Sequence, residues 1–247
     1  MNGPMPSGRK KSSVGTDFFR FPSTPHIAWL GQDLPRDDKL MSSSEVNKLL
    51  SEKVVVEEKL DGANLGISIS PEGEIRTQNR GQYLQQPFIG QFDKLSSWLQ
   101  PREEALFDAL DEHLILFGEW CAARHSLDYE SLPDWFLAFD VYDKRQRAFW
   151  STQRRNQLAQ ELCLATVPTL LLGHFSKPQL IQKLDKQAST YRRGPLEGLV
   201  IRKENPDWLE MRGKLVKAEF VQTITEHWSR RALEWNRIDW SKIAHDT

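Results

Sequence analysis

Short apolar runs that end in charged residues dominate the central part of the chain. Residues 54–59, "VVVEEK", are an apolar run followed by acids, which predicts a buried strand. Leu65, Ile67 and Ile69 then alternate with glycine and serine, and this period of two predicts a second, half-buried strand. The next residues, "PEGE", are typical of a turn, so "EIRTQNR" is expected to return as the other arm of a hairpin.

The remaining patterns predict a mixture of strands and helices. "HLILFGEW", "WFLAFDVYD", "RAFW", "EGLVIRKE" and "KLVKAEF" are predicted to be strands. Helical patterns cover residues 42–53, 92–100, 102–112, 152–164, 177–187 and, at the amphipathic and basic end of the chain, 221–235. Because strands and helices do not alternate regularly, we expect an α+β fold built on mainly antiparallel β-sheets flanked by helices.

The start of the chain differs in composition from the rest. Residues 1–17 are polar, basic and rich in Gly, Pro and Ser, and they are predicted to form a disordered tail. Pro22 and Pro25 interrupt the aromatic stretch that follows, which predicts an extended segment rather than a helix. No internal linker is evident, so residues 18–247 are expected to form one domain that ends in a short helical segment.

Composition and charge exclude several classes of protein. The 247 residues carry a formal net charge of -1, so any surface for a polyanion must be a local patch. The two cysteines, Cys121 and Cys163, lack the spacing of a metal site, which favours a reducing, intracellular setting. No apolar run approaches the ~20 residues that a membrane-spanning helix needs.

Charged residues gather at the ends of the predicted strands. Lys59 ends the first strand and is followed by Asp61 and Gly62. A charge at a strand end is usually solvated, and Asp-Gly is a common turn, so this stretch alone is ambiguous. Glu119 and Glu197 are different, because each has apolar neighbours and would be costly to bury without a partner.

These stretches, in their order along the chain, resemble the motifs of the covalent nucleotidyltransferases, the superfamily of polynucleotide ligases and mRNA capping enzymes. "EKLDGANLGI" resembles the motif that carries the nucleophilic lysine. "NRGQYL", "FGEW", "FLAFDVY", "EGLVIR" and "GKLVK" resemble the later motifs, and together they extend over residues 59–217. Asn64 and the "FPSTPHI" stretch look most similar to the ATP-dependent RNA ligases of the Rnl2-like branch. The resemblance therefore implies a nucleotidyltransferase (adenylyltransferase) fold.

The resemblance implies a catalytic role for five residues. Lys59 would attack the α-phosphorus of ATP, form lysyl-AMP and expel pyrophosphate. Since only a neutral amine attacks, the site is expected to favour the unprotonated lysine through nearby cations and a bound metal. Asp61 would orient the lysine or a metal-bound water, and Lys214 would neutralise developing charge. Glu119 and Glu197 resemble the carboxylates that contact the ribose or hold the catalytic metal, Mg²⁺ or alternatively Mn²⁺.

The resemblance also implies a set of nucleotide contacts. Phe139 is similar to the aromatic residue that stacks on adenine, and Arg80 to an arginine that engages phosphate or the RNA end. The expected cofactor-binding residues are Glu58, Asn64, Arg80, Phe139, Arg212, Lys214 and Lys217. Glu57 and Cys121 are interpreted as structural neighbours. His125 is interpreted as a surface or supporting residue, with a place facing the site as the alternative.

Several of these residues have a structural alternative. Phe139 is equally well explained as a core aromatic, Arg80 as a turn residue and Lys217 as part of a solvated face. The last motif departs from the usual spacing of two basic residues one apart. Arg212 and Lys214 meet that spacing and Lys217 lies three further on, so the pair that contacts the phosphates is left open.

The expected partner is RNA with 5′-phosphate and 3′-hydroxyl ends, with no membrane. About 30 residues follow the last motif, which leaves no room for the OB-fold domain of DNA ligases and capping enzymes. A DNA-nick ligase, a capping-type guanylyltransferase and a non-catalytic nucleotide- or RNA-binding module are the alternatives. A partner protein is the other candidate source of RNA affinity. The candidate RNA contacts are Arg80, Arg124, Lys203, Arg212, Trp228, Arg230, Arg231, Trp235 and Arg237, although the terminal ones are also typical of an amphipathic helix that covers the core.

Overall fold

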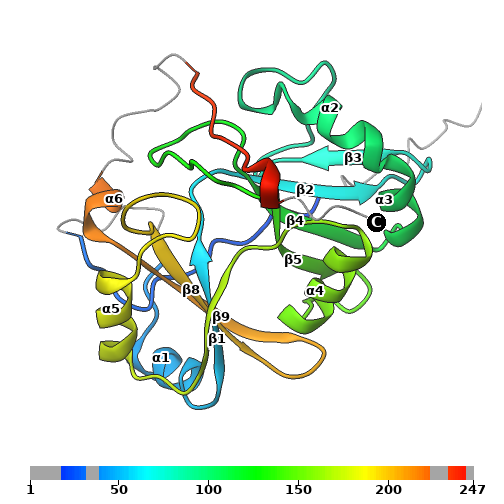
Figure 1. Ribbon diagram of the computed structural model, residues 1–247. Coiled ribbons are helices and arrows are strands. Elements are labelled where there is room, and N and C mark those ends of the chain that lie inside the picture. Colours follow the sequence, from blue (N-terminus) through cyan, green and yellow to red (C-terminus); the bar gives the residue numbers. More distant parts are fainter. Residues whose placement is uncertain (1–17, 32–38, 223–232, 243–247) are drawn as a thin grey trace, which may run out of the picture.

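Two antiparallel sheets form the framework of the computed structural model, which describes residues 18–31, 39–222 and 233–242. The first sheet has the order β7-β1-β8-β9 and the second the order β3-β2-β4-β5-β6. Figure 1 shows the two sheets side by side, with β1, β8 and β9 in one and β2, β3, β4 and β5 in the other. The α+β prediction with mainly antiparallel sheets is confirmed. The strands are β1 (Val54–Lys59), β2 (Ala63–Ile69), β3 (Ile75–Gln78), β4 (Leu114–Trp120), β5 (Phe136–Asp143), β6 (Ala148–Phe149), β7 (Thr169–Gly173), β8 (Gly198–Glu204) and β9 (Leu209–Val216).

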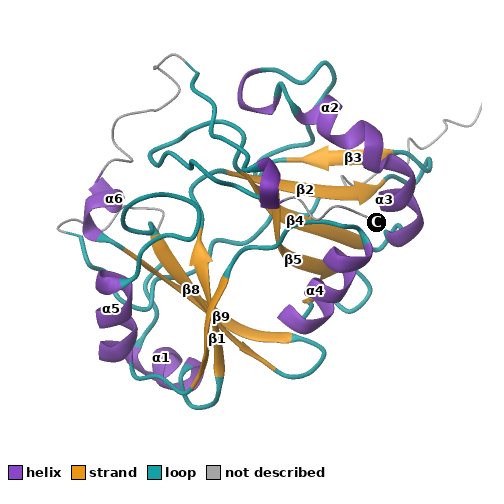
Figure 2. Cartoon of the chain, in the orientation of Figure 1, coloured by secondary structure: helices purple, strands orange, loops and turns teal. Residues whose placement is uncertain are grey.

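Helices cover the outer face of each sheet (Figure 2). α1 (Ser43–Leu49) and α5 (Lys177–Lys186) pack on the first sheet, with Leu49 and Leu184 fully buried in that core. Ser42 and Glu45 form a capping box that fixes the start of α1. The remaining α-helices are α2 (Leu95–Leu99), α3 (Glu103–Ala109) and α4 (Thr152–Glu161), which cover the second sheet, and α6 (Ala218–Gln222), which follows β9. Short 3₁₀ turns occupy Gly90–Phe92, Gln100–Arg102 and Trp240–Lys242.

The N-terminal segment covers the inner face of the second sheet. Phe19 stacks on Tyr142 at 3.7 Å, and Phe21 packs edge-on against Phe117 at 4.9 Å. As a result β2 is buried on both faces, and even the polar Ser68 on its inner side is inaccessible. The prediction of a half-buried strand was wrong, because the alternating pattern does not reveal a distant aromatic segment.

A buried network of ion pairs joins the two sheets. Arg155 on α4 is fully buried and donates to the carboxylate of Glu57 on β1 at 2.7 Å. Arg202 on β8 donates to Asp140 on β5 at 2.7 Å, and Arg212 on β9 pairs with the same aspartate. Since buried charges are stable only when they are paired, this network constrains how the inner faces of the sheets meet.

Three predictions about secondary structure need correction. β7 was missed, because the leucines of this exposed edge strand show no alternation with polar residues. The last predicted strand lies earlier, since β9 ends at Val216 and the "AEF" residues begin α6. The helix predicted over 221–235 is wrong at its end, because residues 233–239 are not helical. Residues 223–232 of this prediction lie outside the described residues.

The prediction for residues 1–17 also lies outside the described residues. Within the described ranges, no helix is both long and apolar enough to cross a bilayer.

Candidate active site

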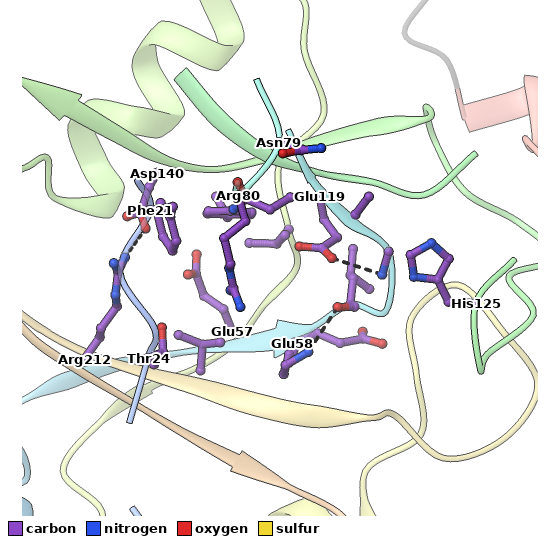
Figure 3. Close-up of a pocket in the computed structure, with 18 of the residues that line it drawn as sticks. Phe21, Thr24, Glu57, Glu58, Asn79, Arg80, Glu119, His125, Asp140 and Arg212 are labelled. Atoms are coloured by element: carbon purple, nitrogen blue, oxygen red, sulfur yellow. Dashed lines mark hydrogen bonds and ion pairs between the residues drawn. The ribbon is translucent and has the colours of Figure 1, made fainter. Parts of the chain in front are cut away.

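A cavity of about 500 Å³ lies between the inner faces of the two sheets (Figure 3). The side chains around it come from strands of both sheets, from the N-terminal segment and from the loops after β3 and β4. The lining residues are Phe21, Thr24, Glu57, Glu58, Lys59, Leu60, Gly62, Ala63, Asn64, Asn79, Arg80, Gly81, Gln91, Phe92, Glu119, His125, Phe139, Asp140, Val167, Val200, Arg202 and Arg212.

Lys59 and Glu197 form an ion pair beside this cavity. β1 pairs in register with β8 so that Lys59 lies opposite Gly198, the residue after Glu197. The Nζ atom of Lys59 donates to both carboxylate oxygens of Glu197 at 2.7 Å. The fold therefore brings two residues 138 positions apart into contact.

Neighbouring groups shift the pKa values of this pair. Burial disfavours the charged amine, but the neighbouring carboxylates, Glu197 above all, outweigh it and raise the pKa of Lys59. The expectation that nearby cations and a bound metal favour the neutral lysine stays a prediction. Burial raises the pKa of Glu197 to about 7, against the opposing effect of the Lys59 ammonium.

Asp61 contacts a neighbouring loop with its carboxylate. Its Oδ2 atom accepts hydrogen bonds from the backbone amides of Ser126 at 2.7 Å and Leu127 at 2.8 Å. The backbone amide of Asp61 donates in turn to the hydroxyl of Tyr129 at 2.8 Å. The turn after Lys59 is therefore tied to the loop after β4.

Gly62 makes the next contact in this turn. Its backbone amide donates to the Glu119 carboxylate at 3.0 Å, and a β-carbon on Gly62 would lie 2.6 Å from the Trp120 carbonyl oxygen. The glycine is thus required by a close approach of two backbones.

Glu119 and Asn64 lie directly opposite one another on β4 and β2. Residues paired in this way share one face of the sheet, and both line the cavity. Burial raises the pKa of Glu119 to about 7, and the charge of Lys59 acts in the opposite direction. Among the described residues the buried Oδ1 of Asn64 has no hydrogen-bond partner, so it is placed to accept one from a ligand.

A β-bulge turns both Phe139 and Asp140 toward the cavity. Asp140 pairs with Phe117 and Ala138 with Gly118, which leaves Phe139 as an extra residue on β5. Successive residues of a regular strand point to opposite faces, so the bulge explains why both neighbours line the cavity. Phe139 also packs edge-on against Phe21 at 5.3 Å.

The two ends of the cavity differ in their charged groups. At one end Arg212 pairs with Asp140 and lies 4.5 Å from the centre of the Phe21 ring (Figure 3). Arg80, on the loop after β3, points into the cavity between the two ends (Figure 3). His125 lies beyond Glu119 at the other end.

His125 belongs to the cavity wall, which agrees with the alternative that it faces the site. Its Nε2 atom is 2.8 Å from the Oε1 atom of Gln91, which also lines the cavity. Burial lowers the pKa of His125, and the carboxylate of Asp61 acts in the opposite direction. The sequence left this placement open, since the loop that positions His125 is held by Asp61, far away along the chain.

The other predicted nucleotide contacts differ in whether their side chains line the cavity. Glu58 lines the cavity, but its carboxylate accepts from Ser189 at 2.6 Å and from the backbone of Thr190 at 2.9 Å. Lys214 lies opposite Val200 and therefore shares the inner face with Arg212, although it is not part of the cavity wall.

Lys217 and Lys203 lie outside the cavity wall. Lys217 follows β9, and its amine donates to the carbonyl oxygen of Asp185 at 3.4 Å. Lys203, predicted to contact RNA, is at the opposite end of β8 from Lys59 and pairs with Glu52 at 2.6 Å. Trp228, Arg230 and Arg231 lie outside the described residues, and Arg124, Trp235 and Arg237 are exposed and are not part of the cavity wall.

The metal prediction for Glu119 and Glu197 is not matched by a preformed cage. Within the described part of the chain, no cluster of three or more His, Cys, Asp or Glu side chains is arranged to hold a metal ion.

Comparison with known proteins identifies relatives of the chain. The family model described as RNA ligase matches residues 52–218. No curated protein matches. A solved mutant of the Naegleria gruberi RNA ligase with ATP and Mn is similar, with a TM-score of 0.58, 18% identity, and coverage of 73% of this chain and 54% of that chain. The same ligase with PPi gives a TM-score of 0.57 and 19% identity over 74% of this chain and 55% of that chain.

The chain thus spans about half the length of these solved relatives, and at such identity the likeness concerns the fold. It confirms the nucleotidyltransferase fold with two antiparallel sheets.

Proposed function

Because the chain belongs to the RNA ligase family, we propose that it is an ATP-dependent ligase that joins RNA ends through a covalent lysyl-AMP on Lys59. One observation carries the proposal. The only residue that fits the nucleophile of the family motif is held by Glu197 at 2.7 Å, beside a cavity that is large enough for a nucleotide.

In the first step the neutral amine of Lys59 attacks the α-phosphorus of ATP. An N–P bond forms, the bond between the α-phosphorus and the bridging oxygen breaks, and pyrophosphate leaves. The lysine must first lose a proton. Glu197 is suited to accept it, because its carboxylate contacts Nζ directly.

The nucleoside would lie between the two sheets. Phe139 offers an aromatic face, and the buried Oδ1 of Asn64, an acceptor with no partner in the described part of the chain, suits a ribose hydroxyl. Arg80 points into the space where phosphates would lie, and Lys214 projects from the same sheet face as Arg212.

A divalent metal fits the oxygen donors of this site. Mg²⁺ keeps several waters and needs only one or two carboxylates plus substrate phosphates, so the absence of a three-ligand cage in the described chain does not conflict with it. Glu119 and Glu197 would hold the metal, with Mn²⁺ as an alternative that is present beside ATP in a solved Naegleria gruberi ligase. The metal would supply positive charge that favours a neutral Lys59 and stabilises the phosphates.

The later steps act on RNA. An oxygen of the RNA 5′-phosphate would attack the phosphorus of lysyl-AMP, and the N–P bond to Lys59 would break. A 3′-hydroxyl would then attack the activated 5′-phosphorus, and AMP would leave. We place the chain with the Rnl2-like branch on the residues around Asn64, and comparison of nicked RNA, nicked DNA and free single strands tests that substrate range.

Self-labelling tests the proposal directly. The protein is incubated with Mg²⁺ and α-labelled ATP, then denatured, and retained label is measured. We expect label on the wild type and on Lys53→Ala, an exposed lysine before the same strand, and none on Lys59→Ala. Label from GTP alone would indicate a capping enzyme, and no label from either nucleotide with Mg²⁺ or Mn²⁺ would leave only a non-catalytic binding module.

A further inference from the structure

A short C-terminal segment, residues 233–239, pairs with the loop after β4. This loop carries His125, which lines the cavity, and we call this side of the cavity its mouth. The backbone amide of Arg124 donates to the carbonyl of Glu234 at 2.8 Å, and the amide of Asn236 donates to the carbonyl of Ala122 at 2.9 Å. The amide of Arg237 donates in turn to a carbonyl of the same loop at 2.9 Å. Backbone hydrogen bonds therefore join the segment to the loop, as they join two short strands.

The buried side chain of Asn236 fixes the position of this segment. Its Nδ2 atom donates to the carbonyl of Cys121 at 2.8 Å, and its Oδ1 atom accepts from the amide of Tyr129 at 2.8 Å. The asparagine thus satisfies backbone groups on both sides of the loop. Trp235, the residue before it, is held in a defined place although 37% of its surface is exposed.

Two cations accompany Trp235. The amine of Lys94 lies 4.6 Å from the centre of the Trp235 ring. Arg124, whose neighbour Ala123 pairs with Trp235, has a 43% exposed side chain that contacts Glu234 at 2.6 Å. We call Lys94, Arg124 and Trp235 the mouth platform.

The mouth platform continues the wall of the cavity. Arg124 is followed by His125, and Lys94 lies three residues after Gln91. His125 and Gln91 are in contact and both line the cavity. A strand whose end is held in the cavity would therefore pass over the mouth platform on its way out.

We infer that the mouth platform binds the RNA strand next to the end that is joined, with a base on the Trp235 ring and the adjacent phosphates on Lys94 and Arg124. This inference rests on the proposed function. Aromatic rings stack on any base, and nearby cations contact the backbone, so the site suits single-stranded RNA with little sequence preference. The contact between Arg124 and Glu234 is exposed and contributes little, so an RNA phosphate can replace it.

The test separates self-labelling from RNA binding. Trp235→Ala, Lys94→Ala and Arg124→Ala should label with ATP as the wild type does, because ATP does not reach the mouth platform. Each should weaken binding of a 5′-phosphorylated RNA and slow AMP transfer to it at low RNA concentration. Loss of one stacked base predicts about 5- to 150-fold weaker RNA binding for Trp235→Ala. Trp235→Phe should recover most of this loss.

Trp240→Ala is the matched control. Trp240 is 72% exposed and lines a different groove, so its removal should leave RNA binding unchanged. If all three platform variants bind RNA as tightly as the wild type does, the inference is overturned, whatever the labelling result. A protein partner would then be the remaining candidate ligand of the mouth platform. If Trp235→Ala also loses labelling, Lys94→Ala and Arg124→Ala decide. If the wild type does not label, the proposed function fails, and direct RNA binding still tests the mouth platform.

Discussion

Replacing Arg155 by methionine tests whether the buried ion network holds the two sheets together. Arg155 has no exposed surface. Its guanidinium donates to the Glu57 carboxylate at 2.7 Å, to the Phe139 carbonyl at 2.8 Å and to the side chain of Asn156 at 2.6 Å. Methionine keeps much of the apolar stem but removes all three donors.

The expected cost follows from the groups left behind. Glu57 is almost completely buried, and the other cation near it among the described residues is Arg202 at 3.8 Å. Removal of one member of a buried ion pair destabilises a protein by about 3–5 kcal/mol, because the other charge stays buried. We expect Arg155→Met to lower the free energy of unfolding by that amount. Glu57→Gln in the same chain should recover part of it, since the unpaired charge is gone.

Urea denaturation followed by tryptophan fluorescence gives both values, and Arg154→Met is the control. Arg154 is on the same helix but stacks on Trp150 at 4.1 Å near the surface, so its loss should cost about 1 kcal/mol or less. A cost below about 1 kcal/mol for Arg155→Met, or no recovery in the double variant with Glu57→Gln, would refute the role of the network.

Three further predictions concern the site. Asn236→Ala leaves buried backbone groups without the partners that this side chain supplies. It should lower the free energy of unfolding, measured in urea, by about 2–4 kcal/mol and slow the rate of self-labelling. An unchanged stability would contradict the role of Asn236 in holding the segment on the loop. The folded protein holds the proton of Glu119 up to about pH 7, whereas the unfolded chain releases it near 4.5, so stability should fall as the pH rises through this window. Glu119→Gln keeps the acceptor for Gly62 and should reduce that slope in urea titrations at pH 5 and pH 8, while Glu197, whose pKa burial also raises to about 7, supplies the rest. An unchanged slope would contradict the contribution of Glu119. Gly62→Ala should lower the thermal midpoint and reduce the free energy of unfolding by about 1–3 kcal/mol, because the new β-carbon would lie 2.6 Å from a backbone carbonyl oxygen. Gly81→Ala, whose β-carbon would have its nearest contact at 3.6 Å, should leave the thermal midpoint unchanged.

The sequence predicted the strands that carry charges at their ends, and with them much of the site. Lys59, Glu119 and Phe139 could be located because each ends or interrupts an apolar run that only a strand explains. The contact between Lys59 and Glu197 depends on the pairing of β1 with β8, which the sequence did not predict.

The remaining features arise from contacts that have no local pattern. Asp61 was expected at the lysine or a metal-bound water, but its carboxylate is held by backbone amides 65 and 66 residues away. The bulge at Phe139 and the place of His125 in the cavity wall depend on backbone geometry rather than on composition. Trp235 was read as part of an amphipathic helix, whereas hydrogen bonds to the loop after β4 hold it in an extended segment.

The pairing of β1 with β8 also makes the nucleophile a reporter of correct folding. Lys59 lies opposite Gly198, and a slip of one residue would turn every side chain of β1 to the other face. Such a misfolded molecule would keep its strand content and its compactness, yet its lysine would point away from Glu197. The fraction of a preparation that can be labelled would then measure the fraction of molecules that have these two strands in register.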